Sequence, residues 1–383
     1  MRVVIVGGGP AAFAAARGYR AANGDGDVSI LTPELTPPYT RPALSKEFLR
    51  GELADVDVPI EPSTWYEQHR IDLRLGTEAE TLNPAQRTLT LATGETLAYD
   101  ACVLATGAEP TPLPVPGATE EFVLLLRSIA TARVLRDRAA QADSAVVIGS
   151  GFIGCEAAAS LAMRGVNTTL VTDEGIPHET RLGEAAGRRI QYWLEELGVE
   201  LVLGHGVEAI ADHAVHVPDR EPVRGDLILM AAGVAPRGGL AGNAHLETHD
   251  GRVTVDATMR TSDPHVYAAG DVAFAYNAAA QRHLNVEHWG EALNMGEIAG
   301  RTIAGEDAQW DVAPGFWSTI GEHTLKYVAW GDGYDEAHLV EHGDGAFTVW
   351  YAQEGTTVGV LTHEADEDYE RGRELIEAEA ALP

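Results

Sequence analysis

The sequence predicts an α/β protein with two doubly wound, Rossmann-like dinucleotide-binding domains and a small C-terminal α+β domain. Three observations lead to this prediction. Residues 2–34 read as an apolar strand, a glycine-rich turn, a helix and a second strand, and residues 144–174 repeat that order. Gly, Asp and Pro then interrupt the helical pattern at residues 304–317. At 383 residues, the chain is long enough for two or three domains, each with its own core.

The first glycine-rich turn, in RVVIVGGGPAAFAAARGYRAANGDGDVSILTPE, has the spacing of a dinucleotide fingerprint. Gly7, Gly9 and Ala12 occupy the G-x-G-x-x-A positions between strand and helix. Backbone N–H groups and the helix N-terminus can therefore face a pyrophosphate. Glu34 follows the second strand, where its carboxylate can accept a hydrogen bond from a ribose hydroxyl.

The pattern recurs about 140 residues later in SAVVIGSGFIGCEAAASLAMRGVNTTLVTDE. Here Gly149, Gly151 and Gly154 follow a second apolar strand. Two complete fingerprints imply that two dinucleotides are bound together. This is typical of a flavin with a nicotinamide, because a hydride donor and its acceptor must be held face to face.

Two further strand ends belong to the first half. YDACVLATGAEP ends a strand in Ala105, Thr106 and Gly107, and TSDPHVYAAGDVA ends one in Gly270 and Asp271. In a flavin domain, an aspartate at such a strand end can hold the ribityl chain. Because the second segment follows the nicotinamide half, we expect the chain to return and complete the flavin domain.

These segments predict three domains. The FAD-binding domain is expected to be discontinuous, at residues 1–115 and 242–305. The NAD-binding domain is inserted at residues 116–241, and a C-terminal domain follows at residues 306–383.

Charge and cysteine usage exclude several classes of function. With 27 basic and 58 acidic residues, the formal charge is −31, so neither nucleic acid nor an anionic membrane is expected as a partner. No apolar run approaches the length of a membrane span and the first strand begins at Arg2 without a leader, so we expect a cytoplasmic protein. Cys102 and Cys155 are 53 positions apart, and the histidines show no ligand spacing, so we expect neither a local redox dithiol nor a metal site.

At these residues the chain resembles the ferredoxin-reductase branch of the FAD-dependent pyridine nucleotide oxidoreductases. That branch includes reductases of oxygenase systems and apoptosis-inducing factor. The matching stretches run from the first residues to about residue 321: VGGGPAA, PPYTRPALSKEFL, ATGAEP, VIGSGFIGCEAAASL, VYAAGDVA, VEHWGEALNMGEIAG and FWSTIG. The remaining tail resembles the small third domain of that family. Together the stretches are specific for the family and much less specific for the electron acceptor.

The resemblance implies roles for the loop around Lys46, which is one of only two lysines beside twenty-five arginines. Arg41, Pro42, Ser45 and Lys46 match the family's R-P-x-L-S-K loop beside the flavin, with Arg41 toward the pyrophosphate and Lys46 toward N5. Glu156 matches the acid that pairs with this lysine. Hydride arriving at N5 adds negative charge to the ring, which a compact ammonium stabilises, and a neighbouring carboxylate keeps a buried lysine charged.

Other matches imply contacts around the flavin ring. Phe152 matches the aromatic residue over the flavin face where nicotinamide stacks. Glu287, His288 and Trp289 match the segment at the flavin's other edge, where Trp289 serves either as an electron relay or as packing. Trp317 matches the tryptophan of an F-W-S-D motif in the third domain, although the aspartate of that motif is a threonine here.

The second fingerprint also predicts which nicotinamide is used. Thr172 stands where the family often has an acid, and Asp173 and Glu174 follow it. These two carboxylates lie where a 2'-phosphate would sit, and no Arg or Lys precedes Arg181 to neutralise that phosphate. We therefore expect NADH rather than NADPH, with Asp173 as a binding residue.

The reaction implied is hydride transfer from NADH to FAD, followed by delivery of single electrons to a ferredoxin-type iron–sulfur protein. Two alternatives stay open. The flavin could pass electrons to oxygen, a quinone or another small molecule. The protein could instead be a redox sensor whose reduced complex with NAD changes its association state. A monomer and a homodimer are both compatible with the sequence.

Overall fold

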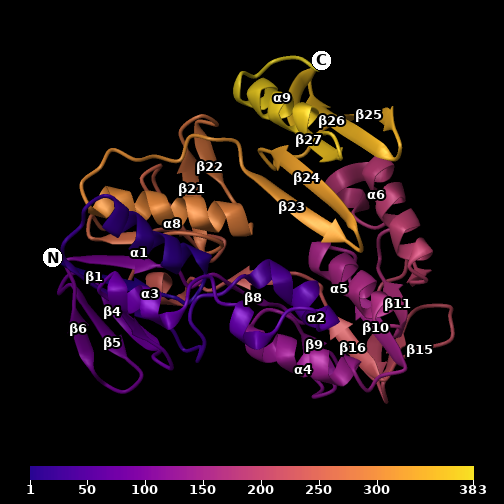
Figure 1. The fold of residues 1–383 in the computed structure, drawn as a ribbon, viewed down its shortest axis with the longest axis horizontal. Helices are drawn as coiled ribbons and strands as arrows, with labels where there is room; N and C mark the ends of the chain where they lie inside the picture. The colour runs from indigo at the N-terminus through magenta and orange to yellow at the C-terminus, as the bar shows by residue number, and fades with distance from the viewer.

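The computed structural model describes residues 1–383 and contains three units, with the C-terminal unit (yellow) above the other two in Figure 1. Five parallel strands form the central sheet of the first unit, in the order β20-β7-β1-β2-β3. Their bounds are Val266–Ala268, Ala101–Leu104, Arg2–Val6, Asp27–Leu31 and Ile71–Arg74. β20 pairs with β7, so two distant segments of the chain complete one sheet.

Two helices of this unit pack unusually closely. They are α1 (Pro10–Ala21) and α8 (Trp289–Ile303). A Cβ atom at Gly296 would lie 2.3 Å from the carbonyl oxygen of Ala11, and one at Gly300 would lie 2.1 Å from that of Ala15. The late segment is therefore held directly against the first dinucleotide helix. Four short helical segments lie between β2 and β3 in the chain: η1 (Arg41–Ser45), α2 (Glu47–Arg50), η2 (Asp55–Asp57) and α3 (Ser63–Gln68).

The second unit repeats the architecture of the first. Its parallel strands follow the order β12-β11-β10-β16-β9, with bounds Glu200–Val202, Asn167–Val171, Ser144–Ile148, Leu227–Met230 and Val123–Leu125. Its helices are α4 (Ile129–Ala139), α5 (Phe152–Met163) and α6 (Glu179–Glu196). β10 and β16 are nearly continuous apolar runs, as expected for parallel strands that are covered on both faces.

Three smaller sheets accompany the two parallel sheets. The antiparallel sheets β4-β5-β6 and β13-β14-β15 have the bounds Ala79–Asn83, Thr88–Leu91, Thr96–Ala98, Ala209–Ala211, Ala214–His216 and Val223–Arg224. A mixed sheet contains β18, β19, β21 and β22, at Thr248–His249, Arg252–Val255, Ala273–Asn277 and Arg282–Leu284. α7 spans Gly239–Asn243.

The two chain crossings between the dinucleotide units lie side by side. β8 (Ala108–Pro110) leads into the second unit and pairs antiparallel with β17 (Val234–Pro236), which leads out of it. This ribbon lies close to the predicted boundaries at residues 115 and 241. We retain the whole division, at residues 1–115, 116–241, 242–305 and 306–383, as a proposal.

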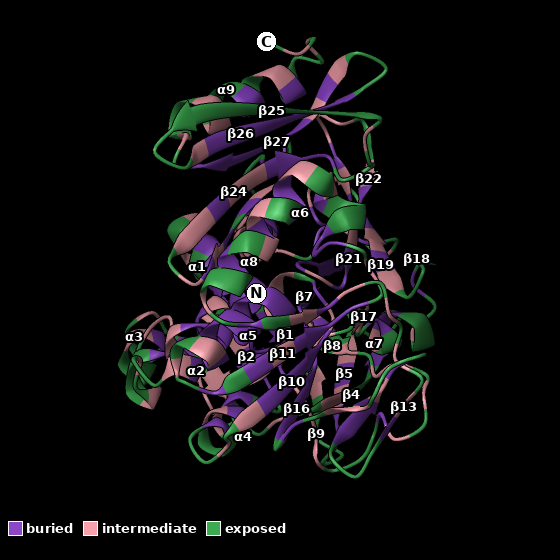
Figure 2. Ribbon diagram, turned by 90° about the vertical axis from the view of Figure 1, so that its right-hand side faces the viewer, coloured by how far each residue is buried: buried purple, intermediate pink, exposed green.

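The C-terminal unit is an antiparallel sheet in the order β23-β24-β27-β26-β25, with helix α9 packed against it. The bounds are Gly315–Ile320, His323–Ala329, Thr356–His363, Ala346–Gln353, Glu336–Gly343 and, for α9, Asp366–Glu377. β25 is exposed along its whole length, green in Figure 2, whereas the central strands of the parallel sheets are buried. The predicted fold class, two Rossmann-like units and a small α+β unit, is confirmed.

An apolar core connects the C-terminal unit with the second dinucleotide unit. One cluster of 33 buried residues contains Cys155 and Ile190 from α5 and α6 together with Ile320 and Phe347 from the C-terminal sheet. Tyr351 adds a buried hydrogen bond, since its hydroxyl donates to the carbonyl oxygen of Leu182 at 2.8 Å. None of the helices is long and apolar enough to cross a membrane.

Candidate active site

The first glycine turn forms a cradle at the N-terminus of α1. Gly7 has φ +140°, and a Cβ atom there would lie 2.0 Å from the carbonyl oxygen of Ala105. Gly9 caps α1, whose first turn carries no acidic side chain, and a Cβ atom at Gly9 would lie 3.9 Å from Nε of Arg41. Ala12 is fully buried behind this turn. Free helix N–H groups beside a guanidinium fit an anionic pyrophosphate.

Arg41 and Glu34 form a salt bridge. Nη2 of Arg41 donates to Oε1 of Glu34 at 2.7 Å, and the Tyr39 hydroxyl donates to Oε2 at 2.6 Å. Each carboxylate oxygen keeps a free lone pair, so Glu34 can still accept a hydrogen bond from a ribose hydroxyl. Pro42 lies in the first turn of η1, where its fixed φ suits the tight turn that carries Arg41.

The ends of β7 and β20 meet beside this cradle. Gly107 and Gly270 have φ of +69° and +78°. The Thr106 hydroxyl donates to the carbonyl oxygen of Arg237 at 2.7 Å, which links this strand end to the exit of the second unit. These predicted residues therefore meet at the carboxyl edge of the sheet, where ligands of such folds bind.

Arg127 is a member of the site that sequence reasoning missed. It forms an ion pair with Asp271, and its Nε donates to the carbonyl oxygen of Ala108 at 3.1 Å. Its own carbonyl oxygen accepts from Nη1 of Arg41 at 2.7 Å. The available signal was an arginine two residues after β9, near the carboxyl end of a parallel strand and just before the Ser128 capping box of α4.

Lys46 and Glu156 form a buried ion pair. Nζ of Lys46 donates to Oε2 of Glu156 at 3.0 Å, and both residues are 6% exposed. The Ser45 hydroxyl donates to the same oxygen at 2.5 Å. The Ser318 hydroxyl, from β23 of the C-terminal unit, donates to Oε1 at 2.7 Å. The ion pair is thus assembled from all three units, and Ser318 was not predicted.

An aromatic cluster adjoins this pair. Phe152, the first residue of α5, has its ring centroid 4.1 Å from that of His178 and 4.8 Å from that of Phe316. His288 stacks on Phe316 at 4.0 Å. The Arg181 guanidinium lies 5.5 Å from the Phe152 ring centroid and 5.7 Å from that of Phe316.

The two imidazoles in this cluster are neutral at physiological pH. Burial, followed by the positive charge of Arg181, lowers the pKa of His178 to about 4 and that of His288 to about 3. They therefore act as uncharged aromatic rings beside a guanidinium, so Arg181 supplies the positive charge of the cluster.

The remaining residues predicted around the flavin ring form no hydrogen bond with the ion pair. Glu287 is exposed and accepts a hydrogen bond from Arg252 at 2.5 Å. Trp289 is half-buried and begins α8. Trp317 is 51% exposed and, by the alternation of β23, faces away from the side on which its two neighbours are buried.

The second glycine turn, like the first, leaves no room for a side chain at two of its positions. Gly149 has φ +102°, and a Cβ atom there would lie 2.5 Å from the carbonyl oxygen of Ala231. A Cβ atom at Gly154 would lie 2.0 Å from the carbonyl oxygen of Gly149. Gly151 caps α5 and has open space around it. This turn also fits a pyrophosphate at a helix N-terminus.

Glu174, rather than Asp173, contacts the second glycine turn. Oε2 of Glu174 accepts from the Ser150 hydroxyl at 2.7 Å, and Oε1 accepts from the N–H of Thr180 at 3.0 Å. Burial opposes ionisation, but the hydrogen bonds from Thr180 and Ser150 outweigh it and lower the pKa of Glu174. Asp173 is exposed beside it.

The two cysteines are separate and buried. Cys102 lies in β7 and Cys155 lies in α5, and both are free thiols. Burial raises the pKa of Cys102 to about 12 and also raises that of Cys155. Neither thiol has the thiolate character that disulfide chemistry requires.

The chain is similar to known reductases over almost its full length. The profile described as pyridine nucleotide-disulphide oxidoreductase matches residues 1–296. A ferredoxin–NAD(P)(+) reductase of a Sphingomonas species is 32% identical, covering 99% of this chain and 94% of its own. A rubredoxin–NAD(+) reductase of Pseudomonas putida is also 32% identical, covering 88% of each chain. The solved covalent putidaredoxin reductase–putidaredoxin complex contains a chain with a TM-score of 0.93 and 28% identity, covering 99% of this chain and 93% of that one.

Proposed function

The chain belongs to the pyridine nucleotide-disulphide oxidoreductase family, and on that premise we propose that it is a flavoprotein reductase that passes electrons from NADH through FAD to a ferredoxin-type iron–sulfur protein. The family implies FAD and NAD(P)H as cofactors. The observation that carries the proposal is the buried Lys46–Glu156 pair at the junction of the units, in a chain whose only two cysteines are buried and apart. Electrons would therefore leave the flavin directly, without a protein disulfide.

Different residues of the chain would bind the two cofactors, place a positive charge beside the flavin ring and exclude water. The α1 N-terminus and Arg41 would hold the FAD pyrophosphate, and the α5 N-terminus would hold that of the nicotinamide cofactor. FAD, when bound, accepts a hydride and releases its electrons singly. Lys46 would keep a positive charge beside the ring, with Glu156 opposing its discharge on burial. Phe152 would cover the nicotinamide side and exclude water.

We predict that NADH is used with a kcat/KM at least about tenfold higher than NADPH, because a 2'-phosphate would meet the carboxylates of Asp173 and Glu174. The position of Arg181 over two aromatic rings supports this, since its charge is engaged elsewhere. Asp173→Arg should lower the ratio of kcat/KM for NADH to kcat/KM for NADPH in steady-state assays. Asp143→Arg, just before the amino end of β10, serves as the matched control, and a higher kcat/KM for NADPH in the parent protein would reverse the assignment.

The acceptor is tested by NADH-dependent reduction of cytochrome c, with and without an added ferredoxin. We expect fast turnover only when the ferredoxin is present. The 32% identity to a rubredoxin–NAD(+) reductase makes a rubredoxin the second acceptor to assay. Fast oxygen consumption by the flavoprotein alone would favour the small-molecule reductase. Slow reoxidation with NADH-dependent dimerisation would favour the redox sensor.

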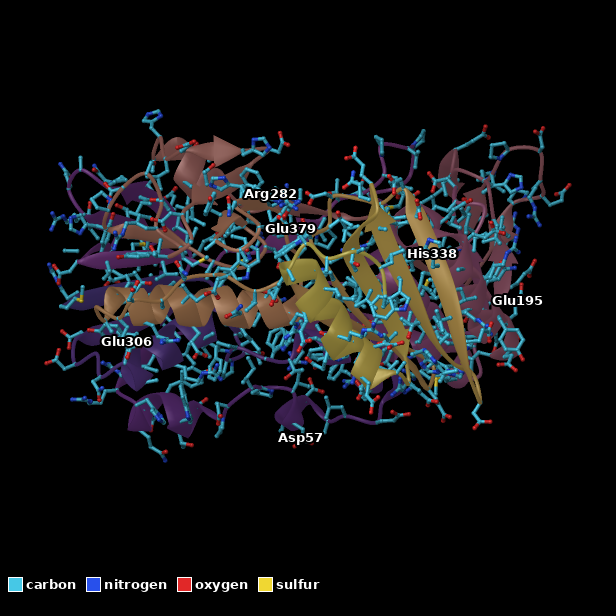
Figure 3. All side chains as sticks on the ribbon, turned by 90° about the horizontal axis from the view of Figure 1, so that it is seen from above. Asp57, Glu195, Arg282, Glu306, His338 and Glu379 are labelled. Atoms are coloured by element: carbon cyan, nitrogen blue, oxygen red, sulfur yellow. The ribbon has the colours of Figure 1, made fainter.

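We also predict that reduction of an acidic ferredoxin depends weakly on salt or speeds up as salt is added. The formal charge is −31, and the exposed Asp57, Glu195 and Glu306 lie far apart in Figure 3. Distant charges are screened because the Debye length is about 8 Å at physiological ionic strength, whereas direct contacts persist. The check is the ferredoxin-dependent assay from low to high salt, with a small acceptor as control. A steep fall confined to the ferredoxin assay would instead indicate a concentrated arginine patch.

A further inference from the structure

Ser318 occupies an unusual place for a serine of the C-terminal sheet. It lies on β23, it is 1% exposed, and its hydroxyl donates to Oε1 of Glu156 at 2.7 Å. Its neighbour Thr319 has the opposite orientation, and its hydroxyl is 3.0 Å from that of Thr324 on the adjacent strand. The buried face of β23 thus presents one hydroxyl to the carboxylate.

The rise between residues along α5 and along β23 explains why this contact forms. Phe152 and Glu156 are four residues apart on the helix, a rise of about 6 Å. Phe316 and Ser318 are two residues apart on the strand, a rise of about 6.6 Å. The two spacings match, so the Phe152–Phe316 ring contact and the Glu156–Ser318 hydrogen bond form together.

The Glu156 carboxylate is consequently fixed on both sides. Ser45 and Lys46 donate to Oε2, and Ser318 donates to Oε1. Without Ser318, the carboxylate would be free to rotate and to offer both oxygens to Lys46. The ammonium would then be drawn toward Glu156, and its field at the bound ring would weaken. If the carboxylate instead kept its orientation, Oε1 would remain buried without a donor, which is costly.

We propose that Ser318 is a positioning residue through which the C-terminal unit sets the orientation of the Lys46–Glu156 pair, and hence the rate of flavin reduction. This inference rests on the proposed function of Lys46. The C-terminal unit would then contribute to the first electron transfer in addition to packing on the second dinucleotide unit.

The experiment is a double-mutant cycle on the FAD-loaded protein. Ser318→Ala should slow reduction of the flavin by NADH by about tenfold in stopped flow, since hydrogen bonds to charged groups are worth about a factor of ten or more. It should also shift the midpoint potential of the flavin to a more negative value. In a Lys46→Ala background, the same substitution should have almost no effect on either quantity, because the two residues act as one unit.

Thr319→Val is the matched control, since it removes a hydroxyl from the same strand on the opposite face. We expect its reduction rate and flavin potential to equal those of the parent protein. If Ser318→Ala slows reduction equally with and without Lys46, or leaves the rate and potential unchanged while Lys46→Ala slows reduction, the positioning role is wrong and the proposed function stands. If Lys46→Ala itself leaves the rate unchanged, the proposed function of Lys46 fails, and with it the inference.

Discussion

Lys46→Ala is expected to slow reduction of the bound flavin by NADH by roughly a hundredfold while FAD stays bound. The substitution removes the only cation of the buried Lys46–Glu156 pair. The reduced ring would then lose a preorganised positive charge, and the Glu156 carboxylate would remain buried without its counter-charge. Both effects raise the barrier to hydride transfer, and the flavin potential should fall as well.

Stopped-flow absorbance of the flavin measures this rate directly. Lys326→Ala is the matched control, because Lys326 is the other lysine of the chain and forms an exposed ion pair with Asp366 at 2.7 Å. We expect that control to reduce at the parent rate. An unchanged rate of flavin reduction in Lys46→Ala would show that Lys46 does not assist hydride transfer.

Gly154→Val is expected to raise the NADH concentration needed for half-maximal reduction by roughly ten- to a hundredfold. The first added carbon would lie 2.0 Å from the carbonyl oxygen of Gly149, so the turn must shift away from α5. Overpacking of this kind costs about 1–3 kcal/mol, equivalent to a factor of roughly 5 to 150 in an equilibrium constant, which brackets the expected change. FAD binding should be unaffected, because its proposed site lies in the other unit.

The variant is tested by titrating NADH against the rate of flavin reduction. Dithionite should reduce its flavin normally, which shows that the FAD site is intact. Gly242→Val is the control, since Gly242 is exposed in α7 and a Cβ atom there would meet open space. Parent-like NADH dependence in Gly154→Val would contradict the assignment of this turn to the nicotinamide cofactor.

The two dinucleotide units could be predicted because their signals are local. A strand, a glycine turn and a helix succeed one another within about thirty residues, and the positive φ of Gly7 and Gly149 explains why those positions are glycine. Asp173 stays a predicted binding residue for the nicotinamide cofactor. The hydrogen bond from Ser150 to Glu174 was not predicted, because the turn after β11 decides which carboxylate faces the glycines.

Other parts of the site depend on contacts that single-sequence patterns do not encode. Arg127 lies 144 positions from its partner Asp271, and Ser318 lies 162 positions from Glu156. Residues this far apart in the sequence form no local pattern from which their contact could be predicted. Lys46 and Glu156 are 110 positions apart, and only the resemblance to a known family predicted that they pair. In the structure, Nζ of Lys46 lies 3.0 Å from Oε2 of Glu156.

The central claim is that the NADH-reduced flavoprotein passes single electrons to an iron–sulfur protein. The most direct measurement mixes the anaerobically reduced protein with an oxidised ferredoxin or rubredoxin and follows the visible absorbance of both partners. The account predicts rapid flavin reoxidation matched by reduction of the iron–sulfur protein, and much slower reoxidation when the same reduced protein is mixed with oxygen. Rapid reoxidation by oxygen, with no electron transfer to either iron–sulfur protein at any salt concentration, would contradict it.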